Sequence, residues 1–513
     1  MTAICTLGLD LGTSSAKAVV LDTGGQVLSQ ASAGYTVTSA VAGYAETEPA
    51  DWWSAVTACA RQAVHAAGAR PAAIGLSGQM HGLVLASAGG RALRPALLWA
   101  DSRATGSLPA YRRLGPAALA RLANPLAPGM TGPMLMWVAE NEPRTYTEAR
   151  WALQPKDWLR GRLTGDIQAE PSDASATLLY DVMGDRWDVE VVSALGLDAG
   201  LLAPLLPSAG AMAGRLTAEA GTELGLPAGI PVAAGAGDTA AAALGSGIGP
   251  GDVQLTVGTG AQVVRPLTAP ASRAEAGVNL YRSAAPGGWS QRPGGWYQMG
   301  ATLNAGLSLN WVREIMNASW EELYASAEQP GPAHDPIFVP HLSGERTPYC
   351  DPALRGSWTA LSLADDRASL LRSALEGTAF SIRDALDAVG GDHRPPHLRL
   401  AGGGTLAAGW RQLLADVLGL PLYAVDVPAA SGRGAALLGA HAAGLLSFAD
   451  IHGPLAPPAH LVAEPDPAMA ARHAERHARF RRTVSALRAS PRPATQAPAM
   501  RAGGPADRAE GAA

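Results

Sequence analysis

The sequence predicts an α/β protein made of two lobes that face each other across a cleft. The first observation is a pair of apolar runs around a short Gly-Thr-Ser turn at 7–22, the pattern of a β-hairpin. The second is a related strand, Gly-Thr turn and strand at 252–264. If helices follow each hairpin, one such unit per lobe is the simplest arrangement. The two hairpins match over a short stretch, so the repeat alone is weak support for a duplication.

The elements after the first hairpin follow from turn and helix signals. A third apolar run at 26–28 comes after the turn 23–25 and extends the hairpin into an antiparallel meander. Pro49 is placed for the first turn of an Ala-rich amphipathic helix that reaches about Ala67. The apolar run at 73–77 then predicts a buried strand.

Composition excludes some classes of function. The 513 residues are 47% hydrophobic and 16% charged, which is enough apolar material for several cores. The 39 Lys and Arg residues against 44 Asp and Glu give a net charge of −5. Such a balance offers no strong field for nucleic acid or an anionic membrane, so we expect neither as a partner.

The cysteines and the N-terminal segment bear on the compartment. Cys5, Cys59 and Cys350 are far apart, which suits a reducing environment better than a disulfide framework and makes no metal motif. The chain begins without the pattern of a signal peptide, and its apolar stretches fall short of about 20 uninterrupted residues. We therefore expect a cytoplasmic protein.

The turn at 10–15 is the first candidate for chemistry. It places successive backbone N–H groups and hydroxyls around a point without bulky side chains, which suits a polyphosphate. Its spacing is neither that of a P-loop nor that of a dinucleotide fingerprint. An ordinary hairpin turn fits the segment equally well. Asp10 favours the functional interpretation, because an acid inside an apolar strand costs several kcal/mol unless it is paired or near a metal such as Mg²⁺.

A second candidate is Asp238, which lies between the Gly-rich loop at 234–237 and an Ala-rich helix. The simple interpretation is that Asp238 or Thr239 is a helix N-cap. The functional interpretation is a general base, because phosphoryl transfer needs one carboxylate to accept the proton of the acceptor hydroxyl.

Polar side chains crowd two further segments, at 77–82 and 99–103. If both follow strands that end at one cleft, they would bind a polyol, with an indole against the carbon face of the sugar; the residues are Gln79, His81, Trp99, Asp101 and Arg103. For His81 alone, a structural histidine with satisfied hydrogen bonds explains the residue at least as well as a sugar ligand. The triple glycine at 402–404, after a strand and before a helix from about Ala407, would admit a flat ligand or phosphate, although a tight loop also explains it.

Taken in order, these segments resemble the FGGY family of carbohydrate kinases over about residues 7–445. The motifs are DLGTSSAK from Asp10, GLSGQMHG from Gly75, LLWADSR from Leu97, PKDWLRGRLTG from Pro155, GDTAA from Gly237, VGTG from Val257, HLSGERTP from His341, LEGTAFSIRD from Leu375 and AGGGTLAAGWRQLLADVLG from Ala401. Within the family, the Met80–His81 pair together with HLSGERTP is similar to members that phosphorylate D-xylulose to D-xylulose 5-phosphate in pentose catabolism. Glycerol kinases carry an Arg-Glu pair in place of the first two residues.

The resemblance implies an α/β fold of two ribonuclease H-like (actin-like ATPase) lobes, with ATP and Mg²⁺ as cofactors and a small-molecule sugar as substrate. It implies that Asp238 is the general base and that Asp10 holds Mg²⁺. The remaining implied contacts are Gly12, Thr13, Ser14, Lys17, Gly258, Thr259, Gly402, Gly403 and Gly404 with ATP and its phosphates, and Met80, His81, Trp99, Asp101 and Thr239 with the sugar.

The expected domains are an N-terminal lobe at 1–245 that binds sugar and phosphate, a C-terminal lobe at 246–485 that binds the nucleotide, and a disordered Ala, Pro, Arg and Gly tail at 486–513. A homodimer is an expectation at the level of the family only.

Three positions depart from the family pattern. Thr239 stands where Asn or Gln is usual, Met134 where lysine is typical, and the run from Ser431 lacks a usual acidic residue. Thr239 leaves open a kinase for another ketose or polyol, such as ribulose, xylitol or arabitol. Two other classes also remain as alternatives: an actin-like ATPase without sugar-kinase activity, and a regulatory sugar-binding protein.

Overall fold

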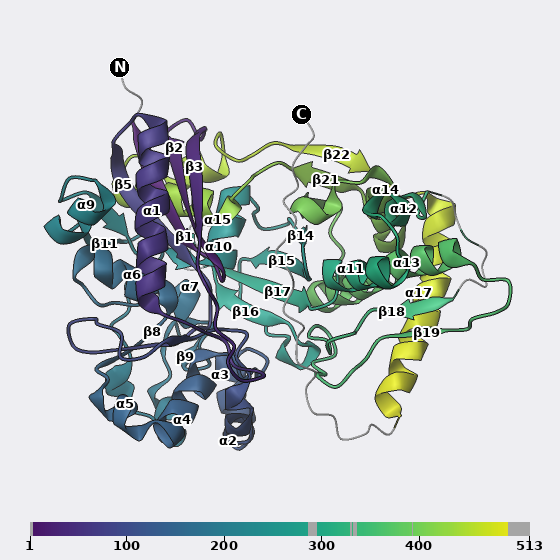
Figure 1. Ribbon diagram of the computed structural model, residues 1–513, viewed down its shortest axis with the longest axis horizontal. Coiled ribbons are helices and arrows are strands. Elements are labelled where there is room, and N and C mark those ends of the chain that lie inside the picture. The colour runs from purple at the N-terminus through teal and green to yellow at the C-terminus, as the bar shows by residue number, and fades with distance from the viewer. Residues whose placement is uncertain (1–3, 286–294, 329–330, 332–335, 392, 491–513) are drawn as a thin grey trace.

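The computed structural model of the protein describes residues 4–285, 295–328, 331, 336–391 and 393–490 (Figure 1). Two seven-stranded sheets lie in the two halves of the molecule, and helices cover them. The α/β fold with two lobes is confirmed.

The first sheet has the order β11-β12-β5-β1-β2-β3, with β13 also paired to β5. Its strands are β1 (Cys5–Leu11), β2 (Ser15–Asp22), β3 (Val27–Gly34), β5 (Pro71–Gly78), β11 (Met212–Arg215), β12 (Pro231–Ala233) and β13 (Ala236–Gly237). β1, β2 and β3 form the predicted antiparallel meander, while β5 runs parallel to β1. Every residue of β1 is buried, as expected for a central strand between layers of helices.

The remaining elements of the first half are short strands and helices around that sheet. The short strands are β4 (Glu46–Thr47), β6 (Val84–Ala86), β7 (Ala96–Leu97), β8 (Trp151–Leu153), β9 (Tyr180–Asp181) and β10 (Arg186–Trp187). The helices are α1 (Pro49–Ala67), α2 (Leu108–Arg112), α3 (Pro116–Leu122), α4 (Thr131–Asn141), α5 (Pro143–Glu148), α6 (Pro155–Thr164), α7 (Pro171–Ala174), α8 (Val189–Ala194), α9 (Ala218–Leu224) and α10 (Asp238–Ser246). The predicted helix from Pro49 to Ala67 is confirmed; Gly68 ends it in the left-handed conformation.

The second sheet has the order β16-β17-β15-β14-β20-β21-β22. Its strands are β14 (Gln254–Val257), β15 (Ala261–Leu267), β16 (Asn279–Arg282), β17 (Trp296–Thr302), β20 (Leu398–Ala401), β21 (Leu422–Val425) and β22 (Ala459–Ala463), and a separate hairpin holds β18 (Ile337–Val339) and β19 (Ser357–Thr359). The helices are α11 (Gly306–Ile315), α12 (Trp320–Ala325), α13 (Arg367–Gly390), α14 (Ala408–Leu418), α15 (Ala430–Ala442), α16 (Phe448–His452) and α17 (Pro467–Ala489).

The two sheets share one plan, which supports the predicted duplication. In each, an antiparallel hairpin is followed by two parallel strands and then by an antiparallel edge strand: β2-β1-β5-β12-β11 in the first sheet and β15-β14-β20-β21-β22 in the second.

Helix α15 belongs to the second half of the chain, but it packs against the first sheet. A Cβ atom on Gly75 would lie 1.7 Å from the carbonyl oxygen of Ala435, and one on Gly8 would lie 2.0 Å from that of Gly432. Glycine in β1 and β5 therefore lets the helix backbone approach the strands closely. Helix α15 therefore follows the second sheet's strands in the sequence but packs on the first sheet in space. The predicted domain boundary near 245 stays a prediction.

The predicted start of the tail at 486 is wrong, because 486–489 form the last turn of α17. The rest of the predicted tail, 491–513, lies outside the described residues. Met134 is fully buried in an apolar cluster of the first half, so the absence of a lysine there matches its surroundings.

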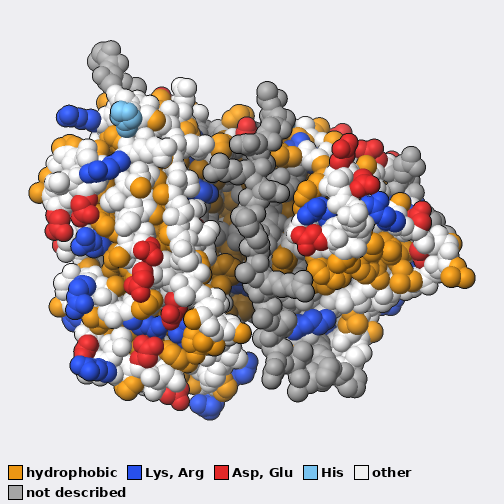
Figure 2. Space-filling view, viewed as in Figure 1, with side chains coloured by type: hydrophobic (Ala, Val, Ile, Leu, Met, Phe, Trp, Pro, Cys, Tyr) orange, Lys and Arg blue, Asp and Glu red, His pale blue; other side chains and the backbone are white. Residues whose placement is uncertain are grey.

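The face shown in Figure 2 mixes acidic and basic side chains over the first half, without a large area of one sign. Hydrophobic side chains gather on the second half, and exposed ones there include Leu307, Trp311 and Ile315 on α11. Within the described ranges, no helix combines the length and apolar character needed to cross a membrane.

Candidate active site

The register of three adjacent strands brings the two predicted acids to one edge of the first sheet. In the ladders, Ser77 of β5 lies between Asp10 of β1 and Ala236 of β13. Gly237 ends β13, and Asp238 follows as the first residue of α10. Because these parallel strands end together, the carboxylates of Asp10 and Asp238 lie on the same edge.

Asp10 is buried and has few partners. The Ser77 hydroxyl donates a hydrogen bond of 3.0 Å to its carboxylate. Burial raises the pKa of Asp10, whereas this hydrogen bond and the charge of Lys17 lower it. Lys17 lies directly across from Asp10 in the β1–β2 pair, so the predicted phosphate contact and the predicted metal ligand are cross-strand neighbours.

Asp238 is partly exposed, and the structure corrects its simplest interpretation. The N-cap of α10 is Gly237, with no side-chain capping hydrogen bond, so neither Asp238 nor Thr239 is the N-cap. Thr239 instead donates its hydroxyl to the Asp238 carboxylate at 3.2 Å. Burial, followed by the negative charge of Asp10, raises the pKa of Asp238 to about 6. Ser431 of α15 donates to the Asp238 backbone carbonyl at 3.2 Å.

The turn after β1 is fixed by hydrogen bonds to its backbone, while its tip is exposed. Gly12 donates its N–H to Ser15 at 3.0 Å, and its carbonyl accepts hydrogen bonds from the Gln79 amide at 3.2 Å and from the Tyr35 hydroxyl. Ser14 is exposed at the tip of the turn. Gln79 thus positions the turn, although the sequence suggested a contact with a polyol.

His81 and Met80 meet tyrosines from the second sheet. His81 Nδ1 lies 2.8 Å from the Ala176 carbonyl oxygen, so Nδ1 carries the proton and Nε2, 3.5 Å from the Tyr281 hydroxyl, is the acceptor. Burial lowers the pKa of His81 to about 4, which keeps the ring neutral. The Tyr297 hydroxyl lies 3.7 Å from the Met80 sulfur.

The backbone at His81 is strained, with a φ of 71° in a residue that is not glycine. Such strain persists where the surrounding structure enforces it and is common at functional sites. Nothing in the sequence around Tyr281 and Tyr297 marked these residues, because both lie in short strands, β16 and β17, that carry no recognised motif.

Trp99 and Asp101 differ in what they offer to a ligand. Trp99 is 41% exposed, and its indole N–H donates to the Thr13 hydroxyl at 2.9 Å. It therefore connects the segment 97–103 to the turn after β1. The Asp101 carboxylate is wholly buried, pairs with Arg103 at 2.8 Å and accepts the N–H of Ala45 at 2.7 Å. In this conformation no acceptor of Asp101 is exposed, and its contact with the sugar stays a prediction.

The run 97–103 is likewise no strand of the main sheet. β7 spans two residues and pairs with β4. The segment reaches the site as a loop held by the Asp101–Arg103 pair, which the apolar pattern of the sequence did not reveal.

In the second half, the turn after β14 is linked to the start of α11. Gly306 donates its N–H to the Gly258 carbonyl at 3.0 Å, and Leu307 donates to that of Thr259 at 2.9 Å. A Cβ atom on Gly258 would meet no atom closer than 4.0 Å, so its backbone faces open space. Glu345, from the HLSGERTP run, accepts the Leu303 N–H at 2.7 Å and braces the approach to α11; the sequence placed no role on this buried acid.

The triple glycine differs at each position. Gly402 has a φ of +88°, and Cβ atoms on Gly402 and Gly404 would lie 2.9 and 2.7 Å from the Val257 carbonyl oxygen. Gly403 has no atom within 4 Å of such a Cβ. Two of the glycines therefore allow the loop to pack on β14, and Gly403 leaves its backbone open to a ligand.

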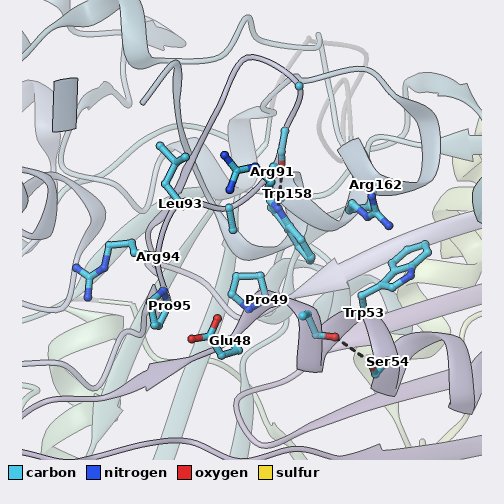
Figure 3. Close-up of a pocket in the computed structure, with 14 residues that line it drawn as sticks. Glu48, Pro49, Trp53, Ser54, Arg91, Leu93, Arg94, Pro95, Trp158 and Arg162 are labelled. Carbon is cyan, nitrogen blue, oxygen red and sulfur yellow. Dashed lines mark hydrogen bonds between the residues drawn. The ribbon is translucent and has the colours of Figure 1, made fainter. Parts of the chain in front are cut away.

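A cavity of about 660 Å³ lies elsewhere on the first half, at the N-terminus of α1 (Figure 3). Glu48, Trp53, Arg91, Trp158 and Arg162 are among its lining residues, and none of the predicted site residues lines it. Its polar groups are partly engaged: the Trp53 indole donates to Glu223 at 2.6 Å. We place the active site at the strand ends, because the paired acids and open backbone loops are there.

Together, the two α/β lobes, the two acids at the strand ends and the open glycine loops are typical of an enzyme of phosphoryl transfer. Comparison with known families agrees. The model of the N-terminal domain of the FGGY family of carbohydrate kinases matches residues 5–245, and that of the C-terminal domain matches 253–443. The chain belongs to the FGGY family and is a carbohydrate kinase.

Individual relatives cover most of the chain. A xylulose kinase of Klebsiella pneumoniae is 32% identical over 94% of this chain and 99% of the relative, and one of Streptomyces rubiginosus is 34% identical over 86% and 88%. The crystal structure of a "xyloylose kinase" from Brucella ovis superposes with a TM-score of 0.87 at 34% identity, over 94% of this chain and 99% of that one. A gluconate kinase of Lactobacillus acidophilus shares the fold with a TM-score of 0.88 at 23% identity, over 95% and 99%.

Proposed function

We propose that this carbohydrate kinase transfers the γ-phosphoryl group of ATP to the terminal hydroxyl of D-xylulose and forms D-xylulose 5-phosphate. The observation that carries the proposal is Asp238, a partly exposed carboxylate beside Asp10 whose pKa is raised to about 6. A base with a pKa near the working pH is well suited to accept a proton and remain ionised. The similarity to xylulose kinases supports the choice of sugar.

Asp238 accepts the proton of the sugar hydroxyl while that oxygen forms the bond to the γ-phosphorus and the bond to the leaving ADP oxygen breaks. Thr239 holds one Asp238 oxygen by its hydroxyl, which orients the carboxylate and stabilises its ionised form. Lobe closure on the sugar would exclude water, which otherwise competes as the acceptor.

The residues near Asp10 fit a magnesium ion. Asp10 is a buried carboxylate that accepts one hydroxyl hydrogen bond, and it adds to the negative charge at Asp238. Carboxylate oxygens are the ligands that Mg²⁺ prefers, and buried acids of this kind are stabilised by a cation. Asp10 would hold the ion, which when bound neutralises charge on the phosphates. Lys17 adds a further positive charge across the strand pair.

We assign the phosphates and adenosine to backbone loops from both halves. Gly12, Thr13 and Ser14 would line the phosphates from the first turn, with Gly258 and Thr259 opposite. The loop of Gly402, Gly403 and Gly404 would face the adenosine. Open space at Gly258 and Gly403 supports these contacts.

We assign the sugar to the wall formed by Met80, His81, Trp99 and Thr239. The neutral His81 ring and the exposed indole of Trp99 offer the hydrogen bonds and the flat face that a sugar needs.

The three cysteines are free, which fits a reaction in the reducing cytoplasm. The homodimer also stays a prediction.

A second candidate is a kinase for another ketose or polyol. Thr239 favours it, because its short side chain is turned toward Asp238 and reaches less far toward a sugar hydroxyl. A coupled ADP-release assay with Mg-ATP and D-xylulose, D-ribulose, L-ribulose, xylitol, D-arabitol, glycerol or no sugar separates the candidates. D-Xylulose should give the highest kcat/KM. A higher kcat/KM with another polyol would keep the kinase mechanism and assign that polyol as the substrate. ADP release that does not depend on any sugar would favour an actin-like ATPase.

The base assignment is tested with Asp238→Ala. The variant should bind ATP normally and lose transfer by about 10³-fold or more, since the proton has no acceptor. Equilibrium ATP binding by calorimetry is the control for folding. Near-normal turnover would remove Asp238 from the role of base.

A further inference from the structure

A cluster of five buried charged side chains lies behind the loop that leads to Asp238. We call it the buried ionic cluster; it consists of Lys156, Asp157 and Arg160 on α6 and Glu170 and Asp173 at α7, each at most 1% exposed. The Lys156 ammonium lies 2.6 Å from Asp157, 3.4 Å from Glu170 and 3.5 Å from Asp173. Because desolvation costs several kcal/mol per ion, apolar side chains would serve stability at least as well. The cluster therefore calls for another role.

One arm of the cluster reaches the start of the loop 234–237. Arg160 donates from Nη1 to the Ala234 carbonyl at 2.8 Å and to the Asp157 carboxylate at 2.9 Å. Asp157 in turn is bound to Lys156. The carbonyl at the first residue of the loop is thus tied to α6 through a charge-assisted hydrogen bond.

The other arm reaches the end of the same loop. The Ser172 hydroxyl accepts the N–H of Gly237 at 3.1 Å and donates to Glu170 at 2.8 Å. Glu170 also caps α7 through the N–H groups of Ser172 and Asp173. The residue immediately before Asp238 is therefore tied to the cluster as well.

The loop and the strand beside it are also packed tightly from behind. A Cβ atom on Gly235 would lie 2.6 Å from the Leu76 carbonyl oxygen, and Gly235 has a φ of +78°. A Cβ atom on Gly78 would lie 2.9 Å from the Cβ of Lys156, so the lysine stem backs the end of β5. The four-residue loop has little room to shift.

We propose that the buried ionic cluster, acting through Arg160 and Ser172, positions Asp238 for proton acceptance. The inference rests on the proposed function, since it takes Asp238 as the base. Both ends of the loop are anchored inside the first half, which holds the Asp238 carboxylate in place relative to the first sheet. A misplacement of about 1 Å costs about 10²-fold in rate.

The charges within the cluster agree with this role. Neither oxygen of Asp173 has a hydrogen-bond partner among the described residues. Burial raises the pKa of Asp173 well above its usual range, and the charges of Asp157, Glu170 and Asp238 raise it further, against Lys156. The charge of Asp238 therefore acts on Asp173, which links the proposed base to the cluster electrostatically.

The test is a double-mutant cycle between Ser172→Ala and Asp238→Ala. Ser172→Ala should lower kcat about 10- to 100-fold and leave both KM values within about threefold, because substrates still bind while the base is displaced. If Ser172 acts through Asp238, the double variant should be no slower than Asp238→Ala alone. Ser373→Ala is the matched control. The hydroxyl of this buried serine of α13 likewise accepts one N–H, from the Trp358 indole at 3.1 Å, and donates to one oxygen, the Leu370 carbonyl at 2.8 Å, and its loss should leave kcat unchanged.

The outcomes separate the two proposals. Unchanged kcat in Ser172→Ala, or multiplicative losses in the double variant, would overturn the positioning role. Near-normal turnover of Asp238→Ala would instead overturn the base assignment. If Ser172→Ala does not fold, as judged by its melting curve against Ser373→Ala, the same cycle is run with Glu170→Gln. That variant keeps the shape of the side chain and removes the charge that binds the Ser172 hydroxyl, with the same expected result.

Discussion

The hairpin turns of the two sheets share a backbone plan and differ in charge. When Gly12 and Thr13 are matched to Gly258 and Thr259, Asp10 corresponds to Thr256. The cross-strand partner is Lys17 for Asp10, whereas Gln262 pairs with Thr256. A carboxylate facing an ammonium group in the first sheet is thus replaced by two neutral side chains in the second.

This difference shows that two sheets with the same backbone plan can carry different side chains at their turns. The strand ladders need only alternating apolar residues and a small turn, so both sheets keep the same course. The charged candidate residues Asp10, Lys17 and Asp238 belong to the first half, while the candidate loops of the second half offer open backbone at Gly258 and Gly403. In the proposed function, the first half would supply the groups that accept the proton and hold the cation, and the second would supply N–H groups.

The largest effect is expected from removing the charge of Asp10, compared with a change at Thr256, the equivalent position of the second sheet. Asp10→Asn should lower kcat about 10³-fold and raise the Mg²⁺ concentration for half-maximal rate, because the cation loses its carboxylate. Thr256→Ala, the equivalent change in the second sheet, should stay within about threefold. Steady-state rates over a Mg²⁺ titration measure both. An unchanged titration for Asp10→Asn would contradict the metal assignment.

A second contrast concerns the helix that covers each sheet. Gly8→Ala should destabilise the protein by about 3 kcal/mol, because the added methyl group meets the Gly432 carbonyl oxygen at 2.0 Å. Gln254→Ala, at the corresponding position of β14, should cost about 1 kcal/mol or less. Urea denaturation of both variants provides the comparison. Equal losses would mean that α15 does not need the close approach at β1.

The pH profile should follow the ionisation of Asp238, the proposed base. The pKa of Asp238 is raised from 3.8 to about 6 by burial and by Asp10, and the ionised form accepts the proton. At low Mg-ATP, kcat/KM should therefore be constant well above pH 6 and fall about tenfold per unit below it. Thr256→Ala should keep the same profile, whereas a profile flat down to pH 4.5 would contradict the assignment.

The smallest effect is expected at the open glycine of the second half. Gly403→Ala should raise the KM for ATP about three- to tenfold, since the methyl group enters space that we assign to the nucleotide. The KM for the sugar and the melting temperature should not change, because no protein atom lies within 4 Å of the new Cβ. A loss of stability without a change in KM would move the nucleotide away from this loop.

Local signals in the sequence predicted much of the fold. Both hairpins and the helix from Pro49 lie where turn residues and apolar periodicity placed them, because their hydrogen bonds join near neighbours. Asp10 and Asp238 stood out because acids amid apolar residues need a reason. That the two acids lie at one edge of the sheet was shown only by the ladders through Ser77.

Local signals did not reveal the surroundings of several side chains near the candidate site. Asp101 reads as a sugar ligand, yet its carboxylate is occupied by Arg103 and Ala45. Tyr281 and Tyr297 look like strand residues, yet they cover His81 and Met80. The contacts of Ala45 with Asp101 and of the two tyrosines with His81 and Met80 join segments far apart in the chain, which no periodic pattern reports.

The sequence by itself determined the two α/β units, the glycine turns and the candidate acids, since backbone hydrogen bonding and the cost of burying charge act on short segments. Only the tertiary structure decided that α15 returns to the first sheet and that Ser172 and Arg160 anchor the loop before Asp238. Those features depend on close packing between distant segments, where a single methyl group or hydrogen bond separates a fit from a clash.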